Sequence, residues 1–190
     1  MAVKYRLGVP VFPGEGPCIA SCGRLSDAYG DHAISCGNEG ERIARHNHLR
    51  DALYHSATAA ALGPVREDKA LIPGSNSLPA DLLIRNWSSG LDAVFDVTVI
   101  NPLQLSLLEK TAEDARHPLD VAFNRKWTMH GEACENEGVR FVPLPATTFG
   151  AWHEVALVEI KKIGTALARH AGQDESESVK PIPETLSSAC

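Results

Sequence analysis

The chain has 190 residues, of which 44% are hydrophobic and 22% charged, a composition that suits one folded domain with an appendage. No apolar run approaches the roughly 20 residues that cross a membrane, and the start lacks a secretory pattern, so we expect an intracellular protein without membrane contact. A formal charge of −6 argues against tight nonspecific binding to nucleic acid, although a local basic groove is compatible with it.

The N-terminal part, residues 1–38, joins an irregular lead-in to a segment rich in cysteine and glycine. Cys18, Cys22, His32 and Cys36 supply four metal-ligating side chains within a short stretch. Three thiolates and one imidazole suit tetrahedral Zn²⁺, which would replace the hydrophobic core that the segment lacks. The other interpretation is a loop of free cysteines. We favour zinc because four such residues rarely cluster by chance.

The next element is a helix over 39–62, which Gly63-Pro64 ends. Leu49 and Leu53 follow the spacing of a buried stripe, and His46 falls on the same face, so its side chain is expected to point toward the sheet. There it would orient a water or touch a phosphate. Alternatively it is a buried helix histidine with no chemical role, which the residue type alone favours.

The remaining pattern alternates strands and helices. It predicts a mixed α/β domain over 39–171 and a disordered acidic tail over 172–190. The expected strands are 65–72, 80–87, 91–100 and 139–144, and the expected helices after the first are 103–114, 118–136 and 152–170.

Two aspartates in the second and third strands carry most of the chemical information. If the two strands form a hairpin about Ser88-Ser89, Asp81 and Asp96 lie opposite each other, and facing carboxylates repel unless a cation lies between them. A hard ion such as Mg²⁺ or Mn²⁺ suits oxygen ligands and can promote phosphodiester hydrolysis. The other interpretation is that Asp96 accepts from a helix N-terminus or pairs with an arginine such as Arg45.

Other side chains are weaker candidates. Lys110 and Lys126 lie on predicted helices, and either would supply the cation that a phosphate-cleaving site needs. Cys134 is most simply a small buried apolar group. The large aromatic rings are expected in the core rather than in a base-stacking platform; they are Trp127, Phe141, Phe149 and Trp152.

These features together resemble the restriction-like endonuclease of site-specific non-LTR retrotransposons and related reverse-transcriptase-linked proteins. The resemblance rests on the order Cys-Cys-His-Cys, Arg45-His46-Asn47, Pro79-Ala80-Asp81 and then Asp96. Three phrases add to it: Tyr29-Gly30-Asp31-His32-Ala33, Asp96-Val97-Thr98-Val99 and Phe141-Val142-Pro143-Leu144. It runs from about Tyr5 to Trp152.

The resemblance implies the PD-(D/E)xK fold, in which a helix, a three-stranded meander, a helix and a parallel strand form the core. It implies that Asp81 and Asp96 hold Mg²⁺, and that the catalytic lysine comes from a later helix, Lys126 first and Lys110 second. Arg45, His46 and Asn47 would match a basic helix motif that contacts nucleic acid, and Cys18, Cys22, His32 and Cys36 would hold Zn²⁺. The implied partners are nuclear DNA and the RNA of a parent element.

The sequence departs from this family in three places. Ala80 separates Pro79 from Asp81, Thr98 stands where the general motif has lysine, and Met129-His130 stands where related chains have lysine-tyrosine. The expectation is a Mg²⁺-dependent DNA endonuclease. The alternatives are a catalytically decayed, zinc-containing nucleic-acid-binding or interaction module retained as a fragment, and a relic with a purely structural fold.

Overall fold

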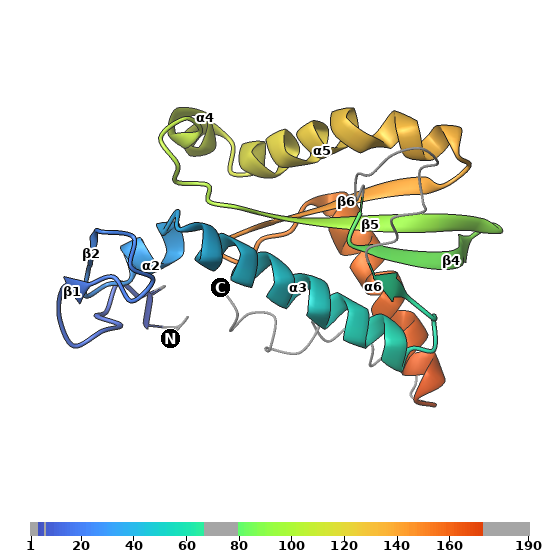
Figure 1. Ribbon diagram of the computed structural model, residues 1–190, viewed down its shortest axis with the longest axis horizontal. Helices are drawn as coiled ribbons and strands as arrows, with labels where there is room; N and C mark the ends of the chain where they lie inside the picture. Colours follow the sequence, from blue (N-terminus) through green and yellow to red (C-terminus); the bar gives the residue numbers. More distant parts are fainter. Residues whose placement is uncertain (1–3, 6, 67–79, 173–190) are drawn as a thin grey trace.

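In the computed structural model, which describes residues 4, 5, 7–66 and 80–172, a four-stranded sheet lies between two layers of helices (Figure 1). The strands lie in the order β3 (Val65–Arg66), β4 (Leu82–Ser88), β5 (Leu91–Ile100) and β6 (Arg140–Thr147). β3, β4 and β5 pair antiparallel, whereas β6 runs parallel to β5. The sheet is therefore mixed, and its central strand is β5.

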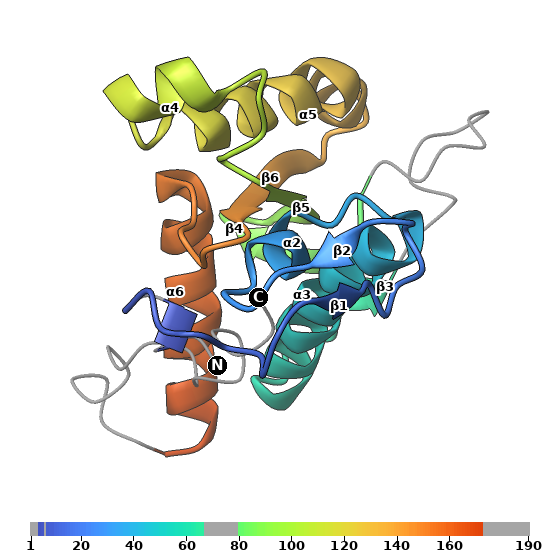
Figure 2. The same cartoon turned by 90° about the vertical axis from the view of Figure 1, so that its left-hand side faces the viewer.

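The helices cover the two faces of this sheet unequally. α3 (Glu39–Ala59) and α6 (Glu154–His170) pack against each other on one face, and α5 (His117–Asn136) covers the other (Figures 1 and 2). The short helix α4 (Leu108–Glu113) precedes α5. None of the described helices is both long and apolar enough to cross a membrane.

A small unit at the N-terminal end of α3 completes the described chain. It contains the two-residue strands β1 (Gly16–Pro17) and β2 (Leu25–Ser26), which pair antiparallel, and the short helix α2 (Asp31–Ser35). The side chain of Asn38 caps α3 by accepting a hydrogen bond from the Gly40 amide. α2 has no buried residue, so apolar packing contributes little to this unit.

The core forms on both faces of β5 because neighbouring side chains of a strand point to opposite sides. Phe95 and Val97 pack with Leu53 of α3 and Ile160 of α6, whereas Val94 packs with Phe141 and the α5 side of the sheet. The strand predicted for 91–100 is thus confirmed, with both of its faces buried. Cys134, which is fully buried, belongs to the α5 side, as expected.

Most predicted elements match the structure to within a few residues, but the helix expected over 103–114 is wrong. Only Leu108–Glu113 is helical there. The Asn101 side chain accepts from the Leu103 amide and its carbonyl from the Gln104 amide, so a turn replaces the first part of the predicted helix. Of the predicted strand 65–72, Val65–Arg66 is present; 67–72 and 173–190 lie outside the described residues.

The β4–β5 hairpin has a different turn from the one expected. Ser88 pairs with Leu91, so the turn is Ser89-Gly90, one residue later than predicted. Further along, Ile84 pairs with Ala93, so β4 carries two more residues than β5 between these pairs. The excess forms a bulge at Asn86, whose φ is 52° and whose amide donates to the Asp92 carboxylate. The bulge compensates for the displaced turn, so residues at the start of β4 have the partners on β5 that the earlier turn predicts.

Glu159, on α6, is a buried charge that joins three elements. Its carboxylate accepts from Trp87 Nε1 of β4 at 2.7 Å, from Arg140 of β6 at 3.0 Å and from Lys162 at 3.0 Å. Burial alone would raise the pKa of Glu159, but the hydrogen bonds from Lys162 and Trp87 and the charge of Arg140 outweigh it and hold the pKa below its ordinary value. The carboxylate is therefore ionised and stabilised by its partners.

We expect Glu159→Gln to destabilise the fold by about 2 kcal/mol, because the amide keeps the side-chain volume but loses the charge-assisted hydrogen bonds. Lys162→Met is the matched control. The Lys162 side chain is 47% exposed, so its loss is expected to cost less than about 1 kcal/mol. Urea unfolding followed by circular dichroism measures both. Equal effects of the two substitutions would contradict a structural role for the buried charge.

Candidate functional site

Asp81 and Asp96 lie together where β4 begins. Leu82 pairs with Phe95, and Asp81, the residue just before β4, lies near Asp96, whose pKa its charge helps to raise. The Asp81 amide donates to the Phe95 carbonyl at 2.9 Å, and its carboxylate Oδ2 accepts from the Val97 amide at 2.7 Å. The Asp81 carboxylate thus binds the Val97 amide of β5, which has no partner strand on that side among the described residues because β4 begins only at Leu82.

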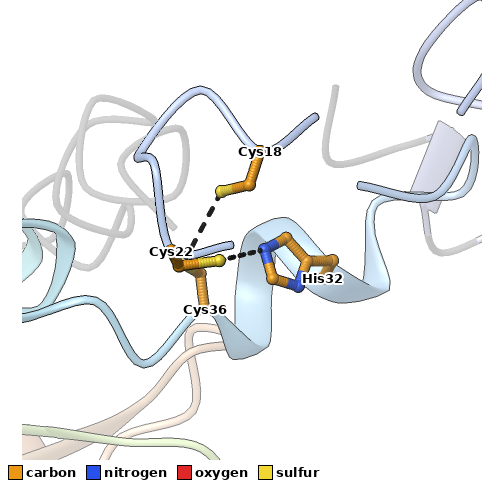
Figure 3. Close-up of side chains that lie close together, drawn as sticks. All are labelled: Cys18, Cys22, His32 and Cys36. Atoms are coloured by element: carbon orange, nitrogen blue, oxygen red, sulfur yellow. Dashed lines mark hydrogen bonds between the residues drawn. The ribbon is translucent and has the colours of Figure 1, made fainter. Parts of the chain in front are cut away.

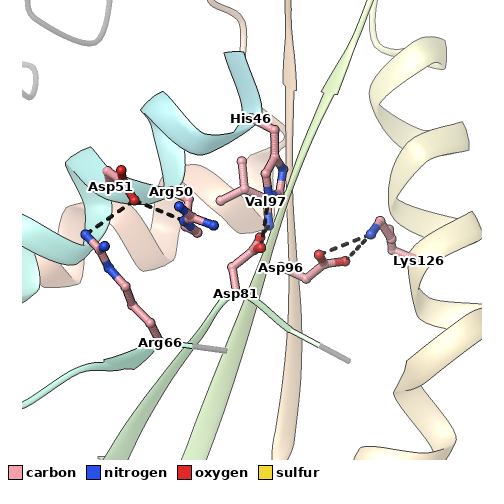
Figure 4. A network of polar contacts seen from close by, with 8 residues as sticks. All are labelled: His46, Arg50, Asp51, Arg66, Asp81, Asp96, Val97 and Lys126. Carbon is pink, nitrogen blue, oxygen red and sulfur yellow. Dashed lines mark hydrogen bonds and ion pairs between the residues drawn. The ribbon is translucent and has the colours of Figure 1, made fainter. Parts of the chain in front are cut away.

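His46 holds the other oxygen of Asp81. Its Nε2 lies 2.9 Å from Asp81 Oδ1 and donates to it, since an ionised carboxylate can only accept (Figure 4). This hydrogen bond is the main cause that raises the pKa of His46, against the opposing effect of burial. The expectation that His46 points toward the sheet is confirmed. Its contact with Asp81 makes it a residue that positions the carboxylate.

Lys126 reaches Asp96 from the opposite helix layer. Its ammonium Nζ lies 3.1 Å from Asp96 Oδ1 and 2.9 Å from Oδ2, and Figure 4 shows it approaching from α5 while His46 approaches from α3. Oδ2 is in contact with the ammonium but lacks hydrogen-bond geometry among the described residues. Between the two lysines considered, Lys126 is therefore the one that contacts the carboxylate pair.

The environment of Asp96 disfavours its charge. The residue is 4% exposed, and this burial is the main cause that raises the pKa of Asp96 to about 6; Lys126 opposes the rise and Asp81 adds to it. Thr98, two residues further along the same face of β5, is 7% exposed and has a buried hydroxyl without a hydrogen-bond partner among the described residues. The site is thus a pair of buried carboxylates with one ammonium.

The structure removes one of the alternatives for Asp96. Arg45 does not pair with it, because its guanidinium donates to the Cys36 carbonyl at 2.9 Å. Asn47 is half-buried on α3 beside His46. Met129, which stands where related chains have lysine, is 61% exposed on α5, one turn after Lys126.

Arg50 is a residue near the site that the sequence reasoning missed. It lies one helical turn after His46, its side chain is 14% exposed, and its charge tends to lower the pKa of His46. Its Nε pairs with Asp51 Oδ1 at 3.0 Å. The signal was available, because a residue four positions after His46 lies on the same helix face.

The four residues predicted to bind zinc come together in the N-terminal unit. The ligand atoms of Cys18, Cys22, His32 and Cys36 all lie within 4.8 Å of one another. Cys18 Sγ is 3.9 Å from Cys36 Sγ, and Cys22 Sγ is 3.3 Å from His32 Nε2 (Figure 3). A tetrahedral site with Zn–S bonds of about 2.3 Å sets its sulfurs about 3.8 Å apart. The group can therefore hold a metal ion and is compatible with zinc.

Local structure explains why these residues converge. The Asp27 carboxylate accepts from the amides of Gly30, Asp31 and His32, which fixes the start of α2 and with it the histidine. Hydrogen bonding to His32 lowers the pKa of the Cys18 thiol to about 6, which favours the thiolate, the form that binds metal.

The metal-ligating unit is attached to the helix that carries His46. The Arg45 guanidinium binds the Cys36 carbonyl, and the Asn38 side-chain amide donates to the Ala20 carbonyl at 2.9 Å. Arg45 and His46 are consecutive residues, so one turn of α3 contacts both the cysteine cluster and Asp81. The two candidate sites are mechanically connected through that turn.

The aromatic residues only partly match expectation. Phe141 is buried, but Trp127 is 37% exposed and stacks on Phe123 with ring centroids 6.3 Å apart. These three rings, with Arg140 and Val155, line an open pocket of about 530 Å³ beside β6. Placing Trp127 in the core was therefore wrong.

No model of a known protein family matches this chain, and a search of curated proteins finds no significant match.

Proposed function

We propose that this chain is a metal-dependent DNA endonuclease with a PD-(D/E)xK core and a zinc-binding N-terminal unit. One observation carries the proposal: Asp81, just before β4, and Asp96 of β5 lie near each other, with a lysine from a later helix at Asp96. A pair of buried carboxylates costs free energy, so its presence favours a functional role over a structural one.

The donor atoms at this site fit a hard divalent cation such as Mg²⁺ or Mn²⁺. Asp96 Oδ2 is a buried acceptor without a directed hydrogen bond among the described residues, an atom that a cation would satisfy. Both aspartates offer oxygen, the ligand that these ions prefer. Carboxylates held between two helix layers would also be pre-oriented for binding.

Each residue has a defined part in the proposed reaction. Asp81, held by His46 and the Val97 amide, and Asp96 would bind the ion, which when present polarises a phosphate and lowers the pKa of a bound water. Lys126 would place its ammonium at the phosphate oxygens, where negative charge develops as the bond breaks. His46 would act by orienting the Asp81 carboxylate.

The resemblance extends the proposal to its biological setting. The chain would act on nuclear DNA, with the RNA of a parent retroelement as a second partner, and the zinc-binding unit would help to position the duplex. Arg45 would contribute through that unit, because its guanidinium is bound to the Cys36 carbonyl. Asn47 stays a candidate for contact with nucleic acid.

A second candidate function is a catalytically decayed nucleic-acid-binding or interaction module that retains the zinc unit. Two observations favour it. Thr98 stands where the general motif has lysine, and Met129 stands exposed where related chains have one. Both candidates predict zinc, so zinc content does not distinguish them, whereas strand cleavage does.

The deciding experiment is nicking of supercoiled plasmid in Mg²⁺ or Mn²⁺. We expect the wild type to convert circles to nicked or linear DNA, and the Asp81→Asn/Asp96→Asn double variant to leave them intact. Glu132→Gln, an exposed residue on the same helix as Lys126, is the control for a changed charge and should cut normally. If the wild type binds DNA and does not cut it in either metal, the decayed module is the better account.

A further inference from the structure

Lys126 and a divalent ion require the same atoms of Asp96. The ammonium lies within 3.1 Å of both carboxylate oxygens, so either oxygen that binds an ion already has a positive charge beside it. This consideration depends on the proposed function, because it takes Asp96 as a ligand of the ion.

The contacts of the two aspartates differ in kind. Asp81 is held by a backbone amide and by His46, both through directed hydrogen bonds. Among the described residues, Asp96 has the single flexible Lys126 as its partner, which donates a hydrogen bond to Oδ1 and holds Oδ2 by charge alone. The Lys126 side chain is 23% exposed and has a flexible four-carbon stem, so its ammonium can leave Asp96 without moving α5.

No other charge described at the site neutralises Asp96 as the Lys126 ammonium does. Asp81 attracts a cation, and His46 and Arg50 lie on the α3 side, where Arg50 pairs with Asp51. On the α5 side, the ammonium that contacts Asp96 is that of Lys126. Two like charges about 4 Å apart in a partly buried site repel strongly enough to change an ion's affinity by tenfold or more.

We propose that Lys126 is a tethered competitor of the divalent ion at Asp96. Its ammonium neutralises the buried carboxylate, and an entering ion must displace it from at least one oxygen. The displaced ammonium would stay close to Asp96, where it could bind a phosphate oxygen. Lys126 thereby weakens metal binding while it supports the chemistry, so its removal has opposite effects on the two.

The test is a calorimetric titration of the zinc-loaded full chain with Mn²⁺. We expect Lys126→Met, which keeps the length of the stem, to bind Mn²⁺ about tenfold more tightly than the wild type. Lys126→Arg, which keeps the charge, should stay close to the wild type. Lys110→Met is the control, since it removes the same charge from α4. Far-ultraviolet circular dichroism checks that each variant is folded.

The outcomes separate this inference from the proposed function. If the wild type binds Mn²⁺ and Asp96→Asn abolishes binding, but Lys126→Met binds equally or more weakly, the competitor role is wrong and the metal site stands. If Mn²⁺ binding is absent in the wild type and in Lys126→Met alike, the metal site itself is wrong, and both proposals fail.

Discussion

The Asp96→Asn variant is expected to lose metal-dependent nicking and, at the same time, to unfold less readily than the wild type at pH 7. Loss of a metal-binding oxygen removes the charge stabilisation on which phosphodiester cleavage depends, so activity should fall by about a thousandfold or more. The gain in stability has a separate cause, which is the cost of an ionised carboxylate that is only 4% exposed.

The sign of the stability effect follows from the pKa of Asp96. Burial raises it from 3.8 to about 6, so the folded protein binds this proton more readily than the unfolded chain. The stability that the protonated form contributes is fully present below pH 3.8 and is lost as the pH rises through about 6. The difference between the two pKa values corresponds to about 3 kcal/mol at pH 7.

Urea unfolding of the zinc-loaded chains without added Mg²⁺ measures this difference. Asp96→Asn should be more stable than the wild type by about 2 to 3 kcal/mol at pH 7, and the difference should shrink as the pH falls toward 4. Glu132→Gln should show neither effect. A less stable Asp96→Asn chain at pH 7 would mean that the ion pair with Lys126 outweighs the cost of burial.

Removal of zinc is expected to unfold the N-terminal unit, residues 16–38, and to leave the sheet and its helices folded. The unit has two-residue strands and a five-residue helix without buried residues, so its hydrogen bonds act without a core of its own and the metal would be its main support. Structural zinc contributes about 10 kcal/mol or more in comparably small units. Hydrogen exchange with and without a strong chelator should show protection lost there and kept in β5 and α5.

Substitution of a ligand gives the same test without a chelator. Cys36→Ser should lower the zinc content measured by elemental analysis from one ion per chain to a small fraction. Cys134→Ala, which alters a buried cysteine in the core on the α5 side, should keep it. If Cys36→Ser retains one tightly bound ion, the cysteine cluster is not the site. Some nicking activity should also be lost in Cys36→Ser. When the unit unfolds, the Arg45 guanidinium loses the Cys36 carbonyl, and the neighbouring His46 is then held less firmly.

The main elements of the fold could be predicted because β5 and α3 have strong periodic patterns. The register between residues 82–84 and 93–95, which brings Asp81 near Asp96, was also predicted, yet from a turn one residue too early. The result held because the bulge at Asn86 restores the register, and the sequence shows no clear signal of a two-residue bulge beyond an asparagine in the strand. That agreement depended on two errors that offset each other.

Other features required the three-dimensional arrangement. The choice between Lys110 and Lys126 depends on which helix faces Asp96, and helix periodicity alone does not determine this. Arg45 was expected at nucleic acid, but the backbone carbonyl of Cys36, which precedes the helix and follows no periodic pattern, cannot be foreseen as its partner. Glu159 had a signal that was overlooked: it adjoins Ile160 in the buried stripe of α6, where a charge needs partners from other elements.

The bulge in β4 separates the length of the hairpin tip from the geometry at its base. Residues 82–84 keep their partners on β5, while the surplus between Ile84 and Ser88 is taken up by the irregular backbone around Asn86. If residues are added or lost at the tip, the irregular backbone around Asn86 can absorb the change. The pairing of Leu82 with Phe95 then stays as it is. A short peptide tag or a fluorescent label placed at Ser89-Gly90 should be tolerated, which makes this tip a suitable attachment point for a probe.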